Sequence, residues 1–245
     1  MANECLAKDE IKHLDLQIDQ PQNGYRFSID PLLLADFARP PAKAKVIDLG
    51  TGCGIIPLLL AKQYDDIRIS GIENNLEMAE LAKQNILANS LVERIEIVAD
   101  DLLNLRSRFS VSSFDLVTSN PPYRTSGSGK ISPKPGRDTA RHESTASLHD
   151  FLAVAKYLVR PTGRICFVYH PARLAEFIRI AGELNLALLR IRMVHGSLNA
   201  SARIFLAELA KGRKGDTQVL PPLFIYNNDG SYTDEASRIT GQTHR

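Results

Sequence analysis

The chain has few cysteines, and their placement argues against two classes of protein. Its 245 residues include only Cys5, Cys53 and Cys166, an odd number, far apart and without a CxxC pair. Such spacing argues against a disulfide framework and against a zinc site, and it fits a reducing compartment. We therefore expect a cytoplasmic protein with no metal site.

Long apolar runs and a strong charge of one sign are also lacking. No stretch approaches the roughly 20 apolar residues that span a bilayer, and the first residues lack the basic and apolar regions of a leader peptide. We therefore expect no membrane partner. The formal net charge is only +2, so any nucleic-acid binding must come from local basic clusters and not from the overall charge.

From about residue 45 onward, short apolar runs alternate with helical patterns. The predicted strands are 46–49, 67–72, 95–98, 114–119 and 164–169, and the predicted helices are 55–63, 76–89, 148–159 and 172–184. This alternation predicts a parallel sheet with helices on both faces. Two β-rich segments, 187–194 and 203–210, are joined by a short link, which predicts antiparallel neighbours. We expect a single α/β domain over residues 1–245, with about seven mostly parallel strands and a final antiparallel strand.

The first 44 residues or so predict an extension to this domain. Segments 14–18 and 25–29 alternate as strands do, and Gln22-Asn23-Gly24 between them is a turn signal. We expect a hairpin there. A helix over 31–38 should follow, with Asp30 as its cap and Pro31 at its first position.

A glycine-rich segment joins the first predicted strand to the first predicted helix. It reads Asp48-Leu49-Gly50-Thr51-Gly52-Cys53-Gly54, and its alternate glycines let a ligand approach the main chain. The GxGxG spacing differs from the dinucleotide fingerprint and from a P-loop. Glu73 ends the second strand, 25 positions after Asp48, and Asp100-Asp101 follows the third strand. All these strand ends share the sheet edge at which open α/β sheets bind ligands.

A stiff segment, Asn120-Pro121-Pro122-Tyr123, directly follows the fourth predicted strand. Two prolines remove two backbone donors and fix two φ angles, so the strand must end there. A planar substrate with an amino group would fit this segment. Asn120 and the Pro121 carbonyl can accept its two hydrogens, and Tyr123 can stack on its face. Taken alone, the segment fits an ordinary Pro-Pro turn equally well.

In order and spacing, these motifs resemble the S-adenosylmethionine-dependent methyltransferases with the class I, Rossmann-like fold. The resemblance implies that the glycine loop passes the methionyl group, that Glu73 holds the ribose hydroxyls, and that Asp101-Leu102 contacts the adenine. Family members with the Asn-Pro-Pro-Tyr segment methylate adenine N6, guanine N2 or a glutamine amide. The implied catalytic residues are Asn120, Pro121, Pro122 and Tyr123. The implied cofactor-binding residues are Ser28, Asp30, Asp48, Gly50, Thr51, Gly52, Gly54, Glu73, Asn74, Asp100, Asp101, Leu102 and Asn120.

The loop 124–142 bears on the substrate, because it is basic and adjoins the catalytic segment. It contains a single acid, Asp138, and five basic residues, which are Arg124, Lys130, Lys134, Arg137 and Arg141. This composition predicts a flap that contacts RNA phosphates. A solvated surface loop is the alternative.

The chain also resembles a narrower group, the bacterial tRNA(Val) adenine-N6 methyltransferases, which modify adenine 37 of the anticodon loop. The resemblance rests on 25–30 with the apolar helix that follows, on Arg141-His142-Glu143, and on Leu220-Pro221-Pro222-Leu223 with Tyr232-Thr233. It implies S-adenosylmethionine as cofactor and tRNA as partner. Methylation of ribosomal RNA guanine N2 or of a protein glutamine stays open, as does an inactive S-adenosylmethionine-binding protein. Both a monomer and a homodimer remain open.

Overall fold

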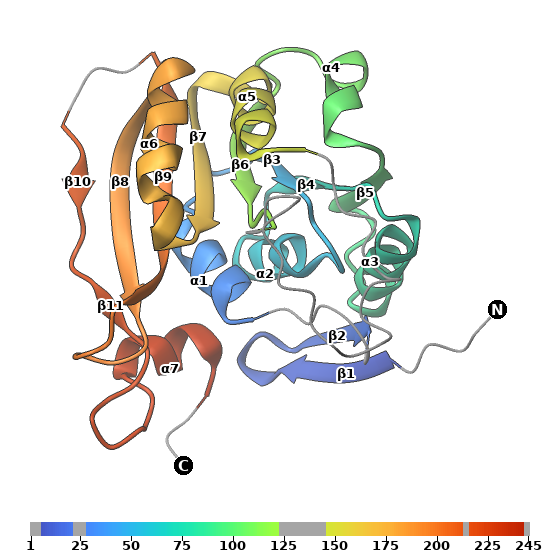
Figure 1. Cartoon of the computed structure of the whole chain (residues 1–245). Coiled ribbons are helices and arrows are strands. Elements are labelled where there is room, and N and C mark those ends of the chain that lie inside the picture. Colours follow the sequence, from blue (N-terminus) through green and yellow to red (C-terminus); the bar gives the residue numbers. More distant parts are fainter. Residues whose placement is uncertain (1–5, 22–27, 123–145, 213–215, 243–245) are drawn as a thin grey trace, which may run out of the picture.

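A nine-stranded sheet forms the centre of the molecule (Figure 1). The computed structural model describes residues 6–21, 28–122, 146–212 and 216–242. The strands of this sheet are β3 (Lys45–Leu49), β4 (Arg68–Glu73), β5 (Ile95–Ala99), β6 (Phe114–Ser119), β7 (Val159–Tyr169), β8 (Leu186–His195), β9 (Ala202–Lys211), β10 (Gln218–Val219) and β11 (Leu223–Phe224). Their order is β10-β8-β9-β7-β6-β3-β4-β5, and β11 also pairs with β8.

Within the described residues, β9 is the strand that runs against its neighbours. It is antiparallel to β7 and to β8, whereas the pairs that join β5, β4, β3, β6 and β7 are parallel. The predicted α/β class and the antiparallel strand near the end of the series are therefore confirmed.

Helices cover both faces of the sheet. They are α1 (Asp30–Phe37), α2 (Ile55–Gln63), α3 (Leu76–Ala88), α4 (Leu105–Arg108), α5 (Leu148–Leu158), α6 (Leu174–Glu183) and α7 (Asp234–Thr240). Successive strand residues point to opposite faces. Val46 therefore joins the core beneath α1, α2, α3 and α7, whereas Ile47 joins the core beneath α4, α5 and α6. Burial on both faces explains why the strands read as continuous apolar runs.

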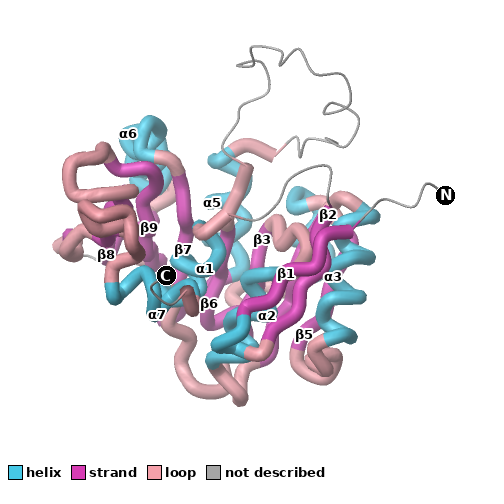
Figure 2. The backbone as a smooth tube through the Cα atoms, turned by 90° about the horizontal axis from the view of Figure 1, so that it is seen from below, coloured by secondary structure: helices cyan, strands magenta, loops and turns pink. Residues whose placement is uncertain are grey.

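The N-terminal hairpin differs from the predicted one. It pairs β1 (Leu6–Ile11) with β2 (Leu16–Pro21) through the short 3-10 turn η1 (Lys12–Leu14), and it lies alongside α3 (Figure 2). The prediction missed β1 because three consecutive charged residues, Lys8-Asp9-Glu10, interrupt its apolar pattern. The predicted turn at 22–24 and most of the predicted partner strand 25–29 lie outside the described residues.

Several element ends also differ from the prediction. Helix α1 begins at Asp30, with Ile29 in the cap position, so the predicted cap is displaced by one residue. Strand β7 begins at Val159, where we predicted the end of a helix. The prediction missed β10 and β11, which have two residues each, and α7, whose N-cap is Thr233.

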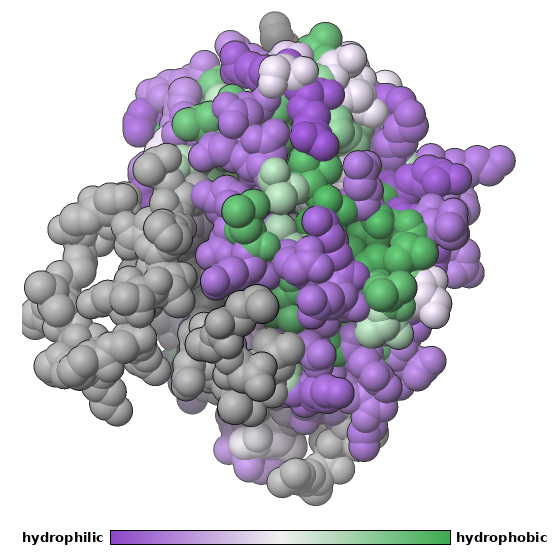
Figure 3. All heavy atoms as spheres, turned by 90° about the vertical axis from the view of Figure 1, so that its right-hand side faces the viewer, coloured by the Kyte–Doolittle hydropathy of each residue, from purple (hydrophilic) through white to green (hydrophobic). Residues whose placement is uncertain are grey.

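The face that carries α3 is mainly hydrophilic, with apolar side chains between the polar ones (Figure 3). Leu76 and Leu87 of α3 are exposed, and so is Val92 in the following turn. Scattered apolar residues are normal on protein surfaces, so this face supports no site by itself. Within the described part of the chain, no helix is both long and apolar enough to cross a bilayer.

Candidate functional site

The loop between β3 and α2 has a backbone that requires its glycines. Gly50, Gly52 and Gly54 have φ angles of 72°, 58° and 86°, a region that residues with a Cβ atom rarely adopt. The Thr51 N–H donates to the Ile72 carbonyl at 2.8 Å, so the loop folds back onto the neighbouring strand β4. The predicted tight turn is therefore present, with its main chain at the carboxyl edge of the sheet.

Glu73, the last residue of β4, supports this loop through its side chain. Its Oε2 accepts the Gly52 N–H at 2.8 Å, and its Oε1 accepts the Asn75 N–H at 2.9 Å. Burial raises the pKa of Glu73, and hydrogen bonds from the backbone N–H groups of Asn75, Gly52 and Asn74 act in the opposite direction. A carboxylate has about four acceptor positions, so Glu73 can hold the loop and still accept hydrogen bonds from a ligand.

Asp48 lies beneath the loop and is fully buried. Its Oδ1 accepts a hydrogen bond from the Thr118 hydroxyl at 2.7 Å. Among the described residues, neither its Oδ2 nor the buried hydroxyl of Thr51 has a hydrogen-bond partner. Burial is the main cause that raises the pKa of Asp48 to about 6, and the negative charge of Glu73 acts in the same direction.

The Asp48→Asn variant should be more stable than the wild type at neutral pH. The folded-state pKa of about 6 lies above the ordinary 3.8, so the folded protein holds this proton more tightly than the unfolded chain. The contribution of Asp48 to stability is thus greatest below its unfolded pKa and is lost as pH rises through about 6. The loss amounts to roughly 3 kcal/mol. Thermal unfolding from about pH 4 to about pH 8 measures it, and equal pH slopes in wild type and variant would contradict it.

The segment after β6 lies directly beside the glycine loop. The Ser119 hydroxyl, at the end of β6, donates to the Leu49 carbonyl at the end of β3 at 2.8 Å. Gly50 and Asn120 therefore follow two paired residues of adjacent parallel strands. Asn120 is half-buried, Pro121 is buried and Pro122 is exposed. The structure thus brings the amide of the predicted catalytic segment to the edge that carries the predicted cofactor loop.

Asp100 and Asp101 continue this edge after β5. The Asp100 N–H donates to the Glu73 carbonyl at 3.0 Å, which joins the two strand ends. Asp101 caps the short 3-10 turn η2 (Leu102–Asn104), where its carboxylate accepts a backbone N–H at 2.8 Å. Leu102 is buried. Both acids therefore have local structural partners in addition to the cofactor contact that the sequence predicts.

The remaining predicted residues fall into two groups. Ser28 and Asp30 lie at the start of α1, where the Ser28 hydroxyl oxygen accepts the Asp30 N–H at 3.2 Å, and Asn74 is exposed after β4. The other predicted residues lie outside the described residues and stay predictions. They are Tyr123, Arg124, Lys130, Lys134, Arg137 and Arg141.

Sequence reasoning missed four residues that support the site. Thr118 and Ser119 bond to Asp48 and Leu49 across adjacent strands, and Asn75 caps α3 next to Glu73. The fourth is Asn85, a buried amide of α3. The sequence did indicate a role for Asn85, because an asparagine at a core position of a helix needs hydrogen-bond partners there.

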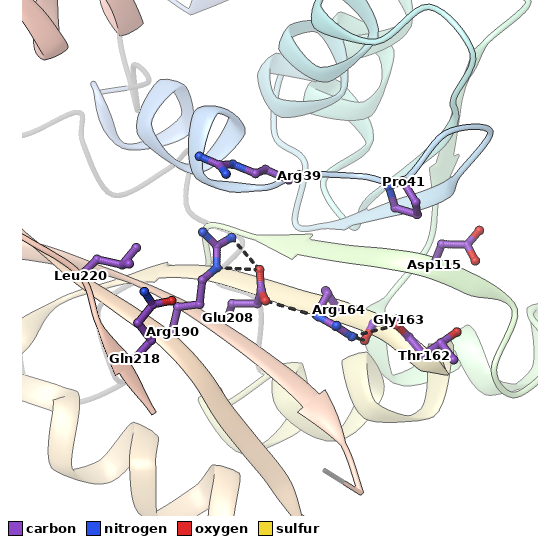
Figure 4. A pocket seen from close by; sticks show the side chains of 10 residues that line it. All are labelled: Arg39, Pro41, Asp115, Thr162, Gly163, Arg164, Arg190, Glu208, Gln218 and Leu220. Carbon is purple, nitrogen blue, oxygen red and sulfur yellow. Dashed lines mark hydrogen bonds and ion pairs between the residues drawn. The ribbon is translucent and has the colours of Figure 1, made fainter. Parts of the chain in front are cut away.

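A hollow of about 620 Å³ lies at the opposite edge of the sheet, near the amino ends of β6 and β7 (Figure 4). Glu208 lies between two arginines there, 2.6 Å from Arg190 and 3.3 Å from Arg164 (N···O). Arg39 and Asp115 also line it. The hollow contains none of the residues of the carboxyl edge, so it is separate from the candidate site.

Comparison with known proteins identifies the family. Residues 29–185 match the model of the methyltransferase small domain. A tRNA1(Val) (adenine(37)-N6)-methyltransferase of Porphyromonas gingivalis is 31% identical over 246 residues, covering 96% of this chain and 94% of the relative. The chain belongs to the tRNA1(Val) (adenine(37)-N6)-methyltransferase family. A second member, from Aeromonas hydrophila, is 27% identical over 91% of this chain and 92% of its own.

Solved structures show that this methyltransferase has the class I fold. A predicted O-methyltransferase from Agrobacterium tumefaciens superimposes with a TM-score of 0.71 at 21% identity, covering 86% of this chain and 95% of that one. A geranyl diphosphate C-methyltransferase from Streptomyces coelicolor, solved with S-adenosyl-L-homocysteine, gives a TM-score of 0.56 at 11% identity over 74% of this chain and 79% of that one. The predicted class I, Rossmann-like fold is therefore confirmed.

Proposed function

We propose that this methyltransferase transfers a methyl group from S-adenosylmethionine to N6 of adenine 37 in tRNA1(Val). The observation that carries the proposal is the backbone pairing of Leu49 with Ser119, after which Gly50 and Asn120 follow on neighbouring strands. The names of the relatives, which match over almost the whole chain, support the choice of tRNA.

The residues of the carboxyl edge fit the proposed cofactor. The loop has three glycines in the left-handed region, and the buried oxygens of Asp48 and Thr51 have no partner among the described residues. The loop would pass the methionyl group, Glu73 would hold the ribose hydroxyls, and Asp101-Leu102 would contact the adenine. When bound, S-adenosylmethionine supplies an activated methyl group on its sulfonium.

Asn120 and Pro121 would prepare the substrate nitrogen. An exocyclic amine conjugated with its ring is a poor nucleophile. Accepting its two hydrogens at the Asn120 amide and the Pro121 carbonyl favours a tetrahedral nitrogen with an available lone pair. These bonds strengthen as positive charge develops, so they stabilise the transition state more than the ground state. Tyr123 would stack on the adenine once it leaves the anticodon-loop stack.

We also infer that the chain forms a single cytoplasmic domain over residues 1–245. Both cysteines within the described residues, Cys53 and Cys166, are buried free thiols, and such thiols are ordinary in a reducing compartment.

The contacts of the N-terminal hairpin bear on the number of domains. The hairpin packs on α2 and α3, which supports one domain over two.

The basic loop 124–142 should provide the RNA contacts. Replacing Lys130, Lys134 and Arg137 by Ala should lower RNA affinity and reduce the salt slope by about 0.7 for each lost phosphate contact. Affinity for S-adenosylmethionine should not change, because the substituted residues are not among those assigned to the cofactor. Titration of labelled tRNA at several salt concentrations measures the slope. An unchanged slope would mean that the loop is only solvated.

Incubation with labelled S-adenosylmethionine and three substrate pools tests the reaction itself. The pools are tRNA lacking N6-methyladenosine, ribosomal RNA, and protein. We expect label only in the tRNA, recovered as N6-methyladenosine after digestion to nucleosides. Label in guanine N2 of ribosomal RNA or in protein glutamine would favour one of the two other reactions, and no label in any pool would favour an inactive cofactor-binding protein.

A further inference from the structure

Asn85 of α3 and Asn89, the C-cap residue of the same helix, bond to the backbone of β2 as a neighbouring strand would. The Oδ1 of Asn85 accepts the Asp19 N–H at 2.8 Å, and its Nδ2 donates to the Asp19 carbonyl at 3.0 Å. Asn89 forms the same pair with Gln17, at 3.0 and 2.6 Å. Both amides therefore attach the N-terminal hairpin to the end of α3, and Figure 2 shows from below that β2 and α3 lie side by side.

The spacing of these residues makes the double attachment possible. Side chains four residues apart lie on the same face of a helix. The backbone N–H and C=O groups of residues two apart point to the same edge of a strand. Four helical residues rise about 6 Å and two strand residues about 6.8 Å. Asn85 and Asn89 therefore meet Asp19 and Gln17 at matching heights, and the buried Leu16 and Ile18 also hold the hairpin against the core.

Asn85 makes one further bond that Asn89 does not make. Its Nδ2 also donates to the Cys53 carbonyl at 3.0 Å, between Gly52 and Gly54 of the cofactor loop. The second bond of the Asn89 Nδ2 goes instead to the Asn85 carbonyl within the same helix. The side chain of Asn85 is buried, with both amide hydrogens and its oxygen in use.

The glycine loop is thus held from two sides. Glu73 accepts the N–H of Gly52, and Asn85 donates to the carbonyl of the next residue, Cys53. Cys53 itself is buried, so its carbonyl has no ready access to water if Asn85 is removed. An unpaired buried carbonyl is costly, and the loop would shift to satisfy it.

We propose that Asn85 is a positioning residue that fixes the S-adenosylmethionine loop and couples cofactor binding to the N-terminal hairpin. The inference rests on the proposed cofactor site. It adds a residue and a coupling that the motifs of the loop do not contain. Because the same amide bonds to Cys53 and to Asp19, ordering of the loop by the cofactor should also restrict β2.

Asn89 provides a matched control for the test. Asn85→Ala and Asn89→Ala each remove one amide pair to β2, but only Asn85→Ala removes the bond to the loop. By calorimetry, Asn85→Ala should weaken S-adenosylmethionine binding about 10-fold. Asn89→Ala should leave the affinity within about twofold of wild type, because it keeps the bonds of Asn85 to both Cys53 and Asp19. Thermal unfolding curves of both variants serve as the control that each variant is folded.

Hydrogen exchange of the wild-type protein gives a second readout that needs no variant. Adding S-adenosylmethionine should increase the protection of amides in β2, most of all at Asp19. Unchanged protection of β2 would overturn the coupling. Unchanged affinity in Asn85→Ala, or equal losses in both variants, would overturn the role of Asn85 at the loop. A wild-type protein that fails to bind S-adenosylmethionine would overturn the proposed function, and this inference with it.

Discussion

Asn120→Ala should lower the single-turnover rate of methylation about 100- to 1,000-fold, the usual loss when one preorganised partner at a reacting centre is removed. Its amide oxygen would accept from N6 most strongly after charge has developed, so the loss should fall on the chemical step. The affinities for S-adenosylmethionine and for tRNA should stay nearly unchanged. Rapid-quench measurement at saturating cofactor and RNA separates the rate from both affinities.

Two further variants separate the acceptor role from general disturbance of the segment. Asn120→Asp keeps an acceptor oxygen and nearly the same shape, so it should retain partial activity. Ser119→Ala removes the hydroxyl that donates to the Leu49 carbonyl but leaves the Asn120 amide in place, so its rate should fall much less. A near wild-type rate in Asn120→Ala would show that the Pro-Pro segment is only a turn.

Glu73→Ala should weaken S-adenosylmethionine binding roughly 5- to 150-fold, corresponding to about 1–3 kcal/mol for buried groups left without an acceptor. Two lost interactions account for this effect. The proposed ribose contact disappears, and so do the acceptors for the N–H groups of Gly52 and Asn75. Calorimetric titration measures the effect directly.

Glu77→Ala is the matched control for this prediction. Glu77 is an exposed acid in the first turn of α3, four residues after Glu73. Its removal deletes the same charge near the same helix end without touching the loop, so cofactor affinity should stay within about twofold. Equal affinity losses in the two variants would mean that only the local charge matters, and unchanged affinity in Glu73→Ala would remove Glu73 from the site.

The sequence predicted the tight glycine loop and the arrangement of the strand ends well, because their signals are local. Gly50, Gly52 and Gly54 meet a backbone requirement within one turn, and Glu73 follows an apolar strand. Once the alternation of strands and helices is read, parallel topology brings such strand ends to one edge. The fold class followed from the same alternation.

The partners of the supporting residues could not be predicted, because they depend on pairing between distant segments. Asn85 meets Asp19, 66 positions earlier, and Cys53, 32 positions earlier. The two-residue strands β10 and β11 exist only because the edge of β8 offers them partners. Strand β1 of the hairpin was not predicted, because its charged residues interrupt the apolar alternation of a strand. The single-domain organisation and the roles of all the predicted site residues stay predictions, and Tyr123 and the basic residues of loop 124–142 also lie outside the described residues.

The most direct test of the central claim is methylation of two tRNA1(Val) transcripts that differ only at position 37. One carries adenine there and the other carries guanine. With labelled S-adenosylmethionine and purified protein, the account predicts that the adenine transcript gains about one N6-methyladenosine per molecule, and that the guanine transcript gains none. Equal labelling of both transcripts, or labelling of neither by a protein that binds the cofactor, would contradict it.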